Sequence, residues 1–308
     1  MPTPEKIFND KVKWLLEREE RLKKRVSSLE VSLLQRITDK LLDRLEKDDS
    51  GQILNNGRNI KLINAIDEIF DEFTKKDHIK VVRGFASDLV ETQRRNELYF
   101  KSLKVEKPDR FKTIAKRSKN KVLRSVGITE KGNLIGGSYL DGLITDTLVK
   151  QEVKKLVFTQ VSSGGSFQAL KDGLSRVVVG DTTVQGKLQQ TYRNFAYDTF
   201  QRVDRTSAKL YADELKMDSF VYAGGLIKTS RDFCEDHNGK IVTREEASKF
   251  KSKIGSKSGP IANRSGYDPL VDLGGFGCRH STRWIPNTLA VRRRKDLKLN
   301  EEGRIEKK

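Results

Sequence analysis

Cysteine, histidine, proline and tryptophan are all scarce in this sequence. The 308 residues include only 2 Cys, 3 His, 6 Pro and 2 Trp. Two cysteines are too few for a disulfide framework, and in a reducing cytosol we expect Cys234 and Cys278 to stay unbridged. No apolar run approaches the roughly 20 residues that span a bilayer, and the first residues, MPTPEKIFND, lack the apolar core of a secretory signal. We therefore expect a protein that is made in the cytoplasm and has no membrane segment.

Acidic residues are too few to balance the basic ones. The chain carries 61 Lys and Arg against 43 Asp and Glu, which gives a net charge of +18. Residues 101–131 carry a net charge of +8 and residues 291–308 a net charge of +4, so two short segments hold most of the excess. A surplus of this size favours association with polyanions at low salt, without indicating which one.

Apolar residues recur at helical spacing through the first hundred residues. From Phe8 to Leu45 they are separated mostly by three, four or seven positions, the pattern of a long amphipathic helix. A helix of roughly 40 residues would be about 60 Å long. The turn-rich stretch DDSGQILNNGRN ends this pattern, and a second helical run follows from Ile60 to Leu98. Two interpretations are open: an intramolecular helical bundle, and an interface with helices of a partner.

The rest of the chain mixes helix, loop and strand patterns. Pro108 precedes a short basic helix, and residues 132–186 read as short helices and loops rich in Gly, Ser and Thr. Helix returns at Leu188. The stretch SFVYAGGLIKTSR is typical of a pair of short strands, and CRHSTRWI predicts the last strand of the domain. Thr243 and Glu246 have the spacing of a capping box that begins a helix.

These patterns predict an α+β protein, with a long helical N-terminal region followed by a small C-terminal α+β domain. We divide the chain into a helical arm or bundle (1–105), a basic helix with a connecting region (106–186), an α+β domain (187–290) and a charged tail (291–308).

Both cysteines and two of the three histidines lie in two short stretches, RDFCEDHNGK at 231–240 and GGFGCRHSTRWIP at 274–286. Cys234 and His237 are three apart, which places them on one face of a helical turn; Cys278 and His280 are two apart, which places them on one face of a strand. Two such pairs can form a tetrahedral Cys2His2 zinc site. The spacing therefore indicates zinc as a candidate cofactor, held by Cys234, His237, Cys278 and His280.

Two other interpretations of this cluster stay open. Free cysteines are often small buried core residues, and His237 would then belong to an exposed turn. A Cys234 thiolate with His280 as its base would instead be a nucleophile pair of an enzyme acting on nucleic acid or protein. No carboxylate pair or phosphate-binding glycine motif accompanies the cluster, so we assign no catalytic residue.

The basic helix after Pro108 is a candidate for DNA binding. Its lysines and arginines would contact phosphates without reading the base sequence. The alternative is a solvated basic face with no ligand. The candidate DNA-binding residues are Lys112, Lys116, Arg117, Lys119, Lys121 and Arg124.

The stretches YAGGLIKTSRDFCEDHNGKIVTREE and DLGGFGCRHSTRWIP together resemble the C-terminal domain of tailed-phage minor head proteins, the Mu F-like head morphogenesis family. The similarity covers roughly residues 187–290. The family's closing segment often has Asn where this chain has Gly277, and His237 is not a hallmark position of the family. The matching positions are Arg231, Cys234, Gly239, Lys240, Cys278, Arg279, His280 and Pro286.

This resemblance implies a non-enzymatic virion component present in few copies. It implies a location in the phage head at the portal vertex, portal or capsid proteins and packaged double-stranded DNA as partners, and a role in head assembly or genome delivery. On this view the long helices would dock on the portal or capsid, and the basic segments would contact DNA.

Overall fold

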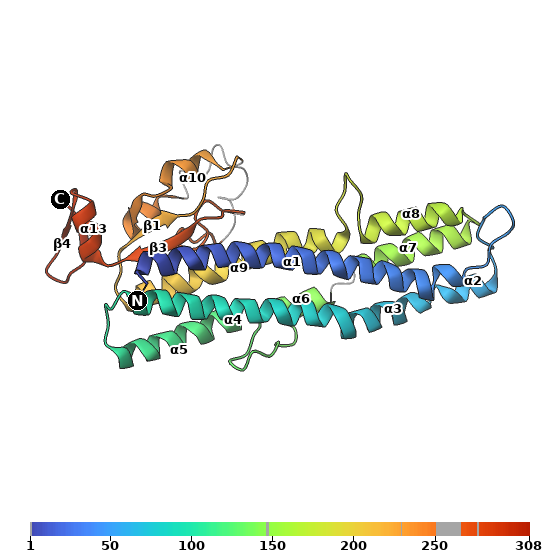
Figure 1. Cartoon of the computed structure of the whole chain (residues 1–308), viewed down its shortest axis with the longest axis horizontal. Helices are drawn as coiled ribbons and strands as arrows, with labels where there is room; N and C mark the ends of the chain where they lie inside the picture. The colour runs from blue at the N-terminus through green and yellow to red at the C-terminus, as the bar shows by residue number, and fades with distance from the viewer. Residues whose placement is uncertain (1, 146–147, 229, 251–265, 276) are drawn as a thin grey trace. The chain divides into compact units, whose positions relative to one another are not determined.

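Helices make up most of the chain, as the apolar spacing predicts (Figure 1). The structure is a computed structural model and describes residues 2–145, 148–228, 230–250, 266–275 and 277–308. The long N-terminal helix is confirmed, because α1 covers 37 residues. The helices of this part are α1 (Pro4–Lys40), α2 (Gly57–Leu62), α3 (Ala65–Phe73), α4 (Ile79–Ser102), α5 (Pro108–Ser125), α6 (Tyr139–Thr145), α7 (Leu148–Ser162), α8 (Phe167–Val178) and α9 (Lys187–Glu214). Two single turns join them, η1 (Leu42–Arg44) and the π-helical η2 (Thr74–His78).

The C-terminal part is a small α+β module, which confirms the predicted fold class. Its three-stranded sheet has the order β2 (Ile241–Thr243), β1 (Ser219–Ala223), β3 (Ser281–Ile285), and both pairings are antiparallel. Short helices precede and follow the strands: α10 (Asp232–His237), α11 (Arg244–Ser248) and α13 (Asn287–Arg293). A second, two-stranded sheet pairs β4 (Leu297–Leu299) with β5 (Ile305–Lys307). Thr243 and Glu246 form the predicted capping box at the start of α11.

Two local predictions in this module are wrong. The stretch from Ser219 to Arg231 contains one strand, β1, and not a pair, because the neighbours of β1 are β2 and β3. Cys278 and His280 lie in the loop before β3 and not on the strand. Their carbonyl oxygens accept hydrogen bonds from the Arg205 side chain, so this backbone is held by a side chain where a strand would be held by a neighbouring strand.

The described residues group into two compact units. Unit 1 comprises residues 1–18, 88–133 and 197–308, and unit 2 comprises residues 19–87 and 134–196. Each unit is drawn from stretches far apart in the sequence, whereas our sequence-based division used consecutive segments, and that division stays a prediction. Within the described ranges, no helix is long and apolar enough to cross a membrane.

The core of unit 1 joins helices to the sheet through aromatic rings. The ring of Tyr211 on α9 stacks on those of Phe100 and Phe111, with centroids 4.8 and 5.7 Å away. Tyr99 on α4 donates a hydrogen bond from its hydroxyl to the carbonyl oxygen of Trp284 on β3, at 2.6 Å. These contacts pack α4 against α9 through Phe100 and against the C-terminal sheet through Tyr99.

A buried carboxyl group caps a helix in unit 2. The side chain of Glu30 on α1 is 0% exposed, and its Oε1 accepts a hydrogen bond from the backbone N–H of Gln189, in the first turn of α9, at 2.8 Å. Burial raises the pKa of Glu30 from 4.5 to about 7, although the hydrogen bonds from Gln189 act in the opposite direction. Desolvation therefore outweighs the favourable place of a carboxylate at a helix N-terminus.

We predict that unit 2 loses stability between pH 4.5 and pH 7. The folded state favours the protonated Glu30 carboxyl, so its stabilisation is complete below the pKa of the unfolded chain and declines as pH rises through about 7. The full effect is up to about 3 kcal/mol, at about 1.4 kcal/mol per pKa unit. Glu30→Gln should remove this pH dependence while keeping an oxygen that can accept from Gln189. Urea unfolding followed by far-UV circular dichroism from pH 5 to 8 measures it.

Glu20→Gln is the matched control, because Glu20 also lies on α1 in unit 2 but its side chain is 63% exposed. It should leave the pH dependence as in the wild type. Both tryptophans, Trp14 and Trp284, belong to unit 1, so far-UV circular dichroism is the appropriate signal for unit 2. An unchanged pH profile in Glu30→Gln would contradict the assignment.

Candidate metal centre

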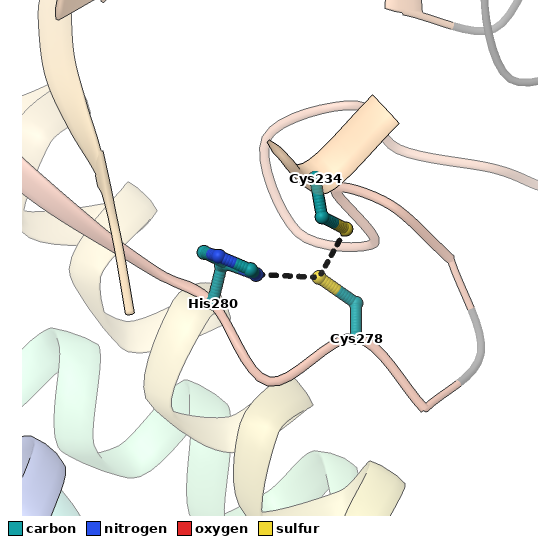
Figure 2. A group of neighbouring side chains, drawn as sticks. All are labelled: Cys234, Cys278 and His280. Carbon is teal, nitrogen blue, oxygen red and sulfur yellow. Dashed lines mark hydrogen bonds between the residues drawn. The ribbon is translucent and has the colours of Figure 1, made fainter. Parts of the chain in front are cut away.

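Three of the four predicted metal ligands meet in the C-terminal module (Figure 2). Cys234 comes from α10, while Cys278 and His280 come from the loop before β3. The two sulfur atoms are 3.9 Å apart, and Cys278 Sγ lies 3.8 Å from His280 Nδ1. All three side chains are buried, and their ligand atoms lie within 4.8 Å of one another. This group could hold a metal ion.

His237 does not belong to this group. It lies on α10 as predicted, but its Nδ1 is 2.7 Å from the carbonyl oxygen of Phe233, within its own helix. Its ring stacks on the ring of Phe233 at 4.3 Å and meets Phe250 edge-on at 4.9 Å. The sequence spacing placed His237 on the correct helix, and the aromatic contacts direct its ring away from a role as ligand.

The buried side chain of Arg205 fixes the loop that carries Cys278 and His280. Arg205 lies on α9, is 2% exposed, and uses three of its nitrogen atoms to donate to this loop. The acceptors are the carbonyl oxygens of Val271, Cys278 and His280. A guanidinium offers several donors in a rigid plane, so one side chain can satisfy several loop carbonyls at once.

A second arginine joins this loop to α10. Arg231, at the N-cap of α10, donates from Nη1 to the carbonyl oxygen of Gly274 at 2.9 Å. Gly274 in turn lies against the cluster. A Cβ atom at this position would be 2.6 Å from Cys234 Sγ and 3.3 Å from Cys278 Sγ. Only a residue without a side chain therefore fits beside the two sulfurs.

The two thiols do not titrate alike. The hydrogen bond with Cys234 holds the pKa of Cys278 well below its usual value against the effect of burial, with further contributions from the Arg205 charge and from His280. The same hydrogen bond, together with burial, raises the pKa of Cys234. The pair therefore loses its first proton easily, from Cys278, and holds the remaining proton tightly between the two sulfurs. The buried guanidinium of Arg205 favours the thiolate at Cys278.

The arrangement suits metal binding better than nucleophilic catalysis. Thiolates and imidazole are the ligand types that zinc prefers. Cys234 and Cys278 are each only 4% exposed, and Gly274 lies against both sulfur atoms. A substrate atom could reach either sulfur only by displacing this packing. A structural metal ion needs no such access, because it is enclosed as the module folds.

The other residues of the predicted motif shape the surroundings of the cluster. Gly239 has φ +76° and donates its N–H to the carbonyl oxygen of Tyr222 at 2.8 Å, while Lys240 is exposed and its carbonyl accepts from the N–H of Tyr222. Arg279 is half-buried between Cys278 and His280. Pro286 is the N-cap of α13.

The predicted DNA-binding residues lie together on α5, apart from the cysteine cluster in the chain and on a different helix. Five of the six are exposed and Lys119 is half-buried, while Phe111, Ile114 and Val122 on the same helix are buried. Arg117 pairs with Glu214 at 2.8 Å. Arg117 and Lys121 also line a cleft of about 400 Å³ together with Arg110, Lys216, Asp213 and Glu214.

Sequence reasoning missed three residues that complete the cluster: Arg205, Tyr222 and Gly274. Tyr222 Oη lies 3.4 Å from each sulfur atom. Arg205 lies on α9 directly after Asp204, which is also buried, and nothing in the spacing of the sequence marks either residue as buried. The pair Gly274 and Gly275 just before Cys278 was the available signal, because paired glycines often mark a close approach of the backbone.

No protein-family profile, curated protein sequence or solved structure matches this chain.

We predict that Gly274→Ala disrupts the cluster. The added methyl group would overlap Cys234 Sγ, and overpacking of this kind typically costs about 1–3 kcal/mol. We expect a lower midpoint of urea unfolding for the metal-free protein, followed by tryptophan fluorescence, and a weaker response to added zinc.

Gly225→Ala is the matched control, since no atom lies within 4 Å of the corresponding Cβ position. It should unfold at the wild-type urea concentration. Equal stability of Gly274→Ala and the wild type would show that the packing around the sulfurs is looser than described.

Proposed function

We propose that this chain is a minor head protein of a tailed bacteriophage, with a structural and non-enzymatic role. It would reside in the phage head at the portal vertex, contact portal or capsid proteins and the packaged double-stranded DNA, and act in head assembly or genome delivery. The two sequence stretches that resemble the Mu F-like family carry this proposal, together with the fact that they meet.

The meeting of the two stretches is the main support. Cys234 and Cys278 are 44 positions apart, yet their sulfur atoms are 3.9 Å apart. Arg231, another position of the resemblance, donates to Gly274 directly across the same junction. The positions that carry the resemblance therefore hold the module together, which is what a structural motif would do.

A structural zinc ion is part of the proposed function. Cys234, Cys278 and His280 would hold it, and the ion would join α10 to the loop before β3. Small modules often gain part of their folding free energy from such an ion, because the site does not exist in the unfolded chain. The enclosure of the sulfurs supports this role over the alternative, an enzyme that uses Cys234 and His280 on nucleic acid or protein.

The location is tested on particles. Heads purified from cells producing the phage whose genome encodes this chain should contain it in few copies, detected by quantitative mass spectrometry. Antibody labelling should place it at one vertex. Its absence from purified heads, or a copy number equal to that of the major capsid protein, would overturn the proposal.

DNA contact is supported by the charge of α5. At 100° per residue, Arg117, Lys121 and Arg124 fall on one flank of the buried face, and Lys112, Lys116 and Lys119 fall on the other. Lys112 and Lys116 on one flank and Lys121 and Arg124 on the other are exposed, so both flanks offer charges to phosphates, which carry no sequence information.

We predict non-specific DNA binding with a steep dependence on salt. Each phosphate contact contributes about 0.9 to the slope of log K against log salt concentration, so replacing three lysines with glutamine should reduce the slope by up to about 2.7. The variant is Lys112→Gln, Lys116→Gln and Lys119→Gln, and fluorescence anisotropy with duplexes of unrelated sequence measures binding.

The matched control replaces three exposed lysines outside α5: Lys24, Lys75 and Lys80. Its net charge is the same as that of the α5 variant, so a slope reduced only in the α5 variant assigns the contact to this helix. Equal reductions would show that total charge alone determines binding, and a flat salt dependence of the wild type would contradict DNA contact.

A further inference from the structure

Two of the three distances between the ligand atoms are close to those of a tetrahedral ion, and the third, between Cys234 and His280, is no more than 4.8 Å. Zinc bonds of about 2.3 Å to sulfur and 2.0 Å to nitrogen, at tetrahedral angles, separate two sulfurs by about 3.8 Å and a sulfur from a nitrogen by about 3.5 Å. The corresponding distances are 3.9 Å between the sulfurs and 3.8 Å from Cys278 Sγ to His280 Nδ1. Cys278 therefore lies near ligand distance of both other ligand atoms, and an ion would draw Cys234 and His280 towards each other.

An oxygen atom lies at the distance that a fourth ligand would have from both sulfurs. Tyr222 Oη lies 3.4 Å from Cys234 Sγ and 3.4 Å from Cys278 Sγ. A zinc-bound oxygen at about 2.0 Å would lie about 3.5 Å from each sulfur ligand. The ring of Tyr222 also packs against the ring of His280, with centroids 4.7 Å apart. Among the described residues His237 is not part of the ligand group, and its Nδ1 lies 2.7 Å from the carbonyl oxygen of Phe233.

The surroundings hold Tyr222 in this position. Tyr222 is 0% exposed and lies on β1, between β2 and β3, where its backbone is fixed on both sides. Its N–H donates to the carbonyl oxygen of Lys240 and its carbonyl accepts from the N–H of Gly239. A Cβ atom at Gly274 would lie 3.2 Å from Tyr222 Oη as well as close to both sulfurs. Gly274 therefore covers the face formed by the two sulfurs and this oxygen.

Burial and the two neighbouring thiols raise the pKa of Tyr222 well above its usual value, so its hydroxyl is protonated in the metal-free protein. A bound cation reverses this preference, because its charge favours the deprotonated oxygen beside it.

We infer that Tyr222 supplies the fourth ligand, so that the site is formed by two sulfurs, one nitrogen and one phenol oxygen from Cys234, Cys278, His280 and Tyr222. This inference rests on the proposed zinc site and replaces His237 in the predicted ligand set. When zinc binds, the Tyr222 hydroxyl gives its proton to the buffer and its oxygen bonds to the ion.

The test compares Tyr222→Phe with the wild type in zinc titrations of the full chain against a chromophoric chelator. Loss of one ligand should weaken zinc binding by at least about tenfold, since even outer-shell partners contribute 10–100-fold. Zinc should also produce the near-ultraviolet difference absorption of one tyrosinate per chain in the wild type and none in Tyr222→Phe. Calorimetry in buffers of different ionisation enthalpy should show one proton fewer released by the variant.

His237→Gln is the matched control, since His237 also contacts the Tyr222 ring but is not in the inferred ligand set. It should bind zinc as the wild type does and keep the tyrosinate signal. Weaker binding in His237→Gln with full binding in Tyr222→Phe would overturn the inference in favour of the original set.

The outcomes separate this inference from the proposed function. If the wild type binds zinc through its cysteines but shows no tyrosinate absorption, the fourth ligand is not Tyr222 and the structural zinc site stands. If the wild type and Cys278→Ser both fail to bind zinc, the site and the inference both fail. If Tyr222→Phe does not fold, the tyrosinate signal of the wild type decides alone.

Discussion

The hydrogen bonds of Arg205 are the constraint on which the C-terminal module depends. A guanidinium buried to 2% exposure needs several acceptors, and it finds them in the carbonyl groups of a loop that has no strand partner. Because this loop is held against α9, Cys278 and His280 face Cys234 on α10. The cysteines thus approach each other because Arg205 donates hydrogen bonds to the carbonyl groups of Val271, Cys278 and His280.

The two units use the same physical device at different places. In unit 1 the buried guanidinium of Arg205 donates hydrogen bonds to loop carbonyl groups. In unit 2 the buried carboxyl group of Glu30 accepts a hydrogen bond from the backbone N–H of Gln189. Each device places an ionisable group in a low-dielectric environment, where its charge needs a partner. For Arg205 the neighbouring Cys278 thiol supplies the counter-charge when it is ionised. The residue that anchors the loop therefore also favours the thiolate that a metal ion would bind. For Glu30 the group stays protonated up to about neutral pH.

Periodicity was enough to predict the helices, the α+β class and the capping box of Thr243 and Glu246, because these depend on local spacing. The position of Cys278 and His280 before β3 was not predictable in this way, since it depends on Arg205, more than 60 residues earlier in the chain. Cys234, Cys278 and His280 were found because cysteine and histidine are rare and grouped in the sequence. Tyr222 and Gly274 were missed, because a tyrosine in a strand and a glycine in a loop are ordinary until the fold brings them to the sulfurs.

On our proposal, the two cysteine-containing stretches hold a metal ion that closes the module. The most direct measurement is the metal content of the full chain, purified without added metal, by inductively coupled plasma mass spectrometry, with Cys278→Ser alongside. We expect about one zinc per chain, and we expect Cys278→Ser to lose both the zinc and thermal stability. A well-folded chain without zinc that neither takes up the ion nor gains stability from it would rule out the metal site. The two stretches would then meet through packing and hydrogen bonds alone.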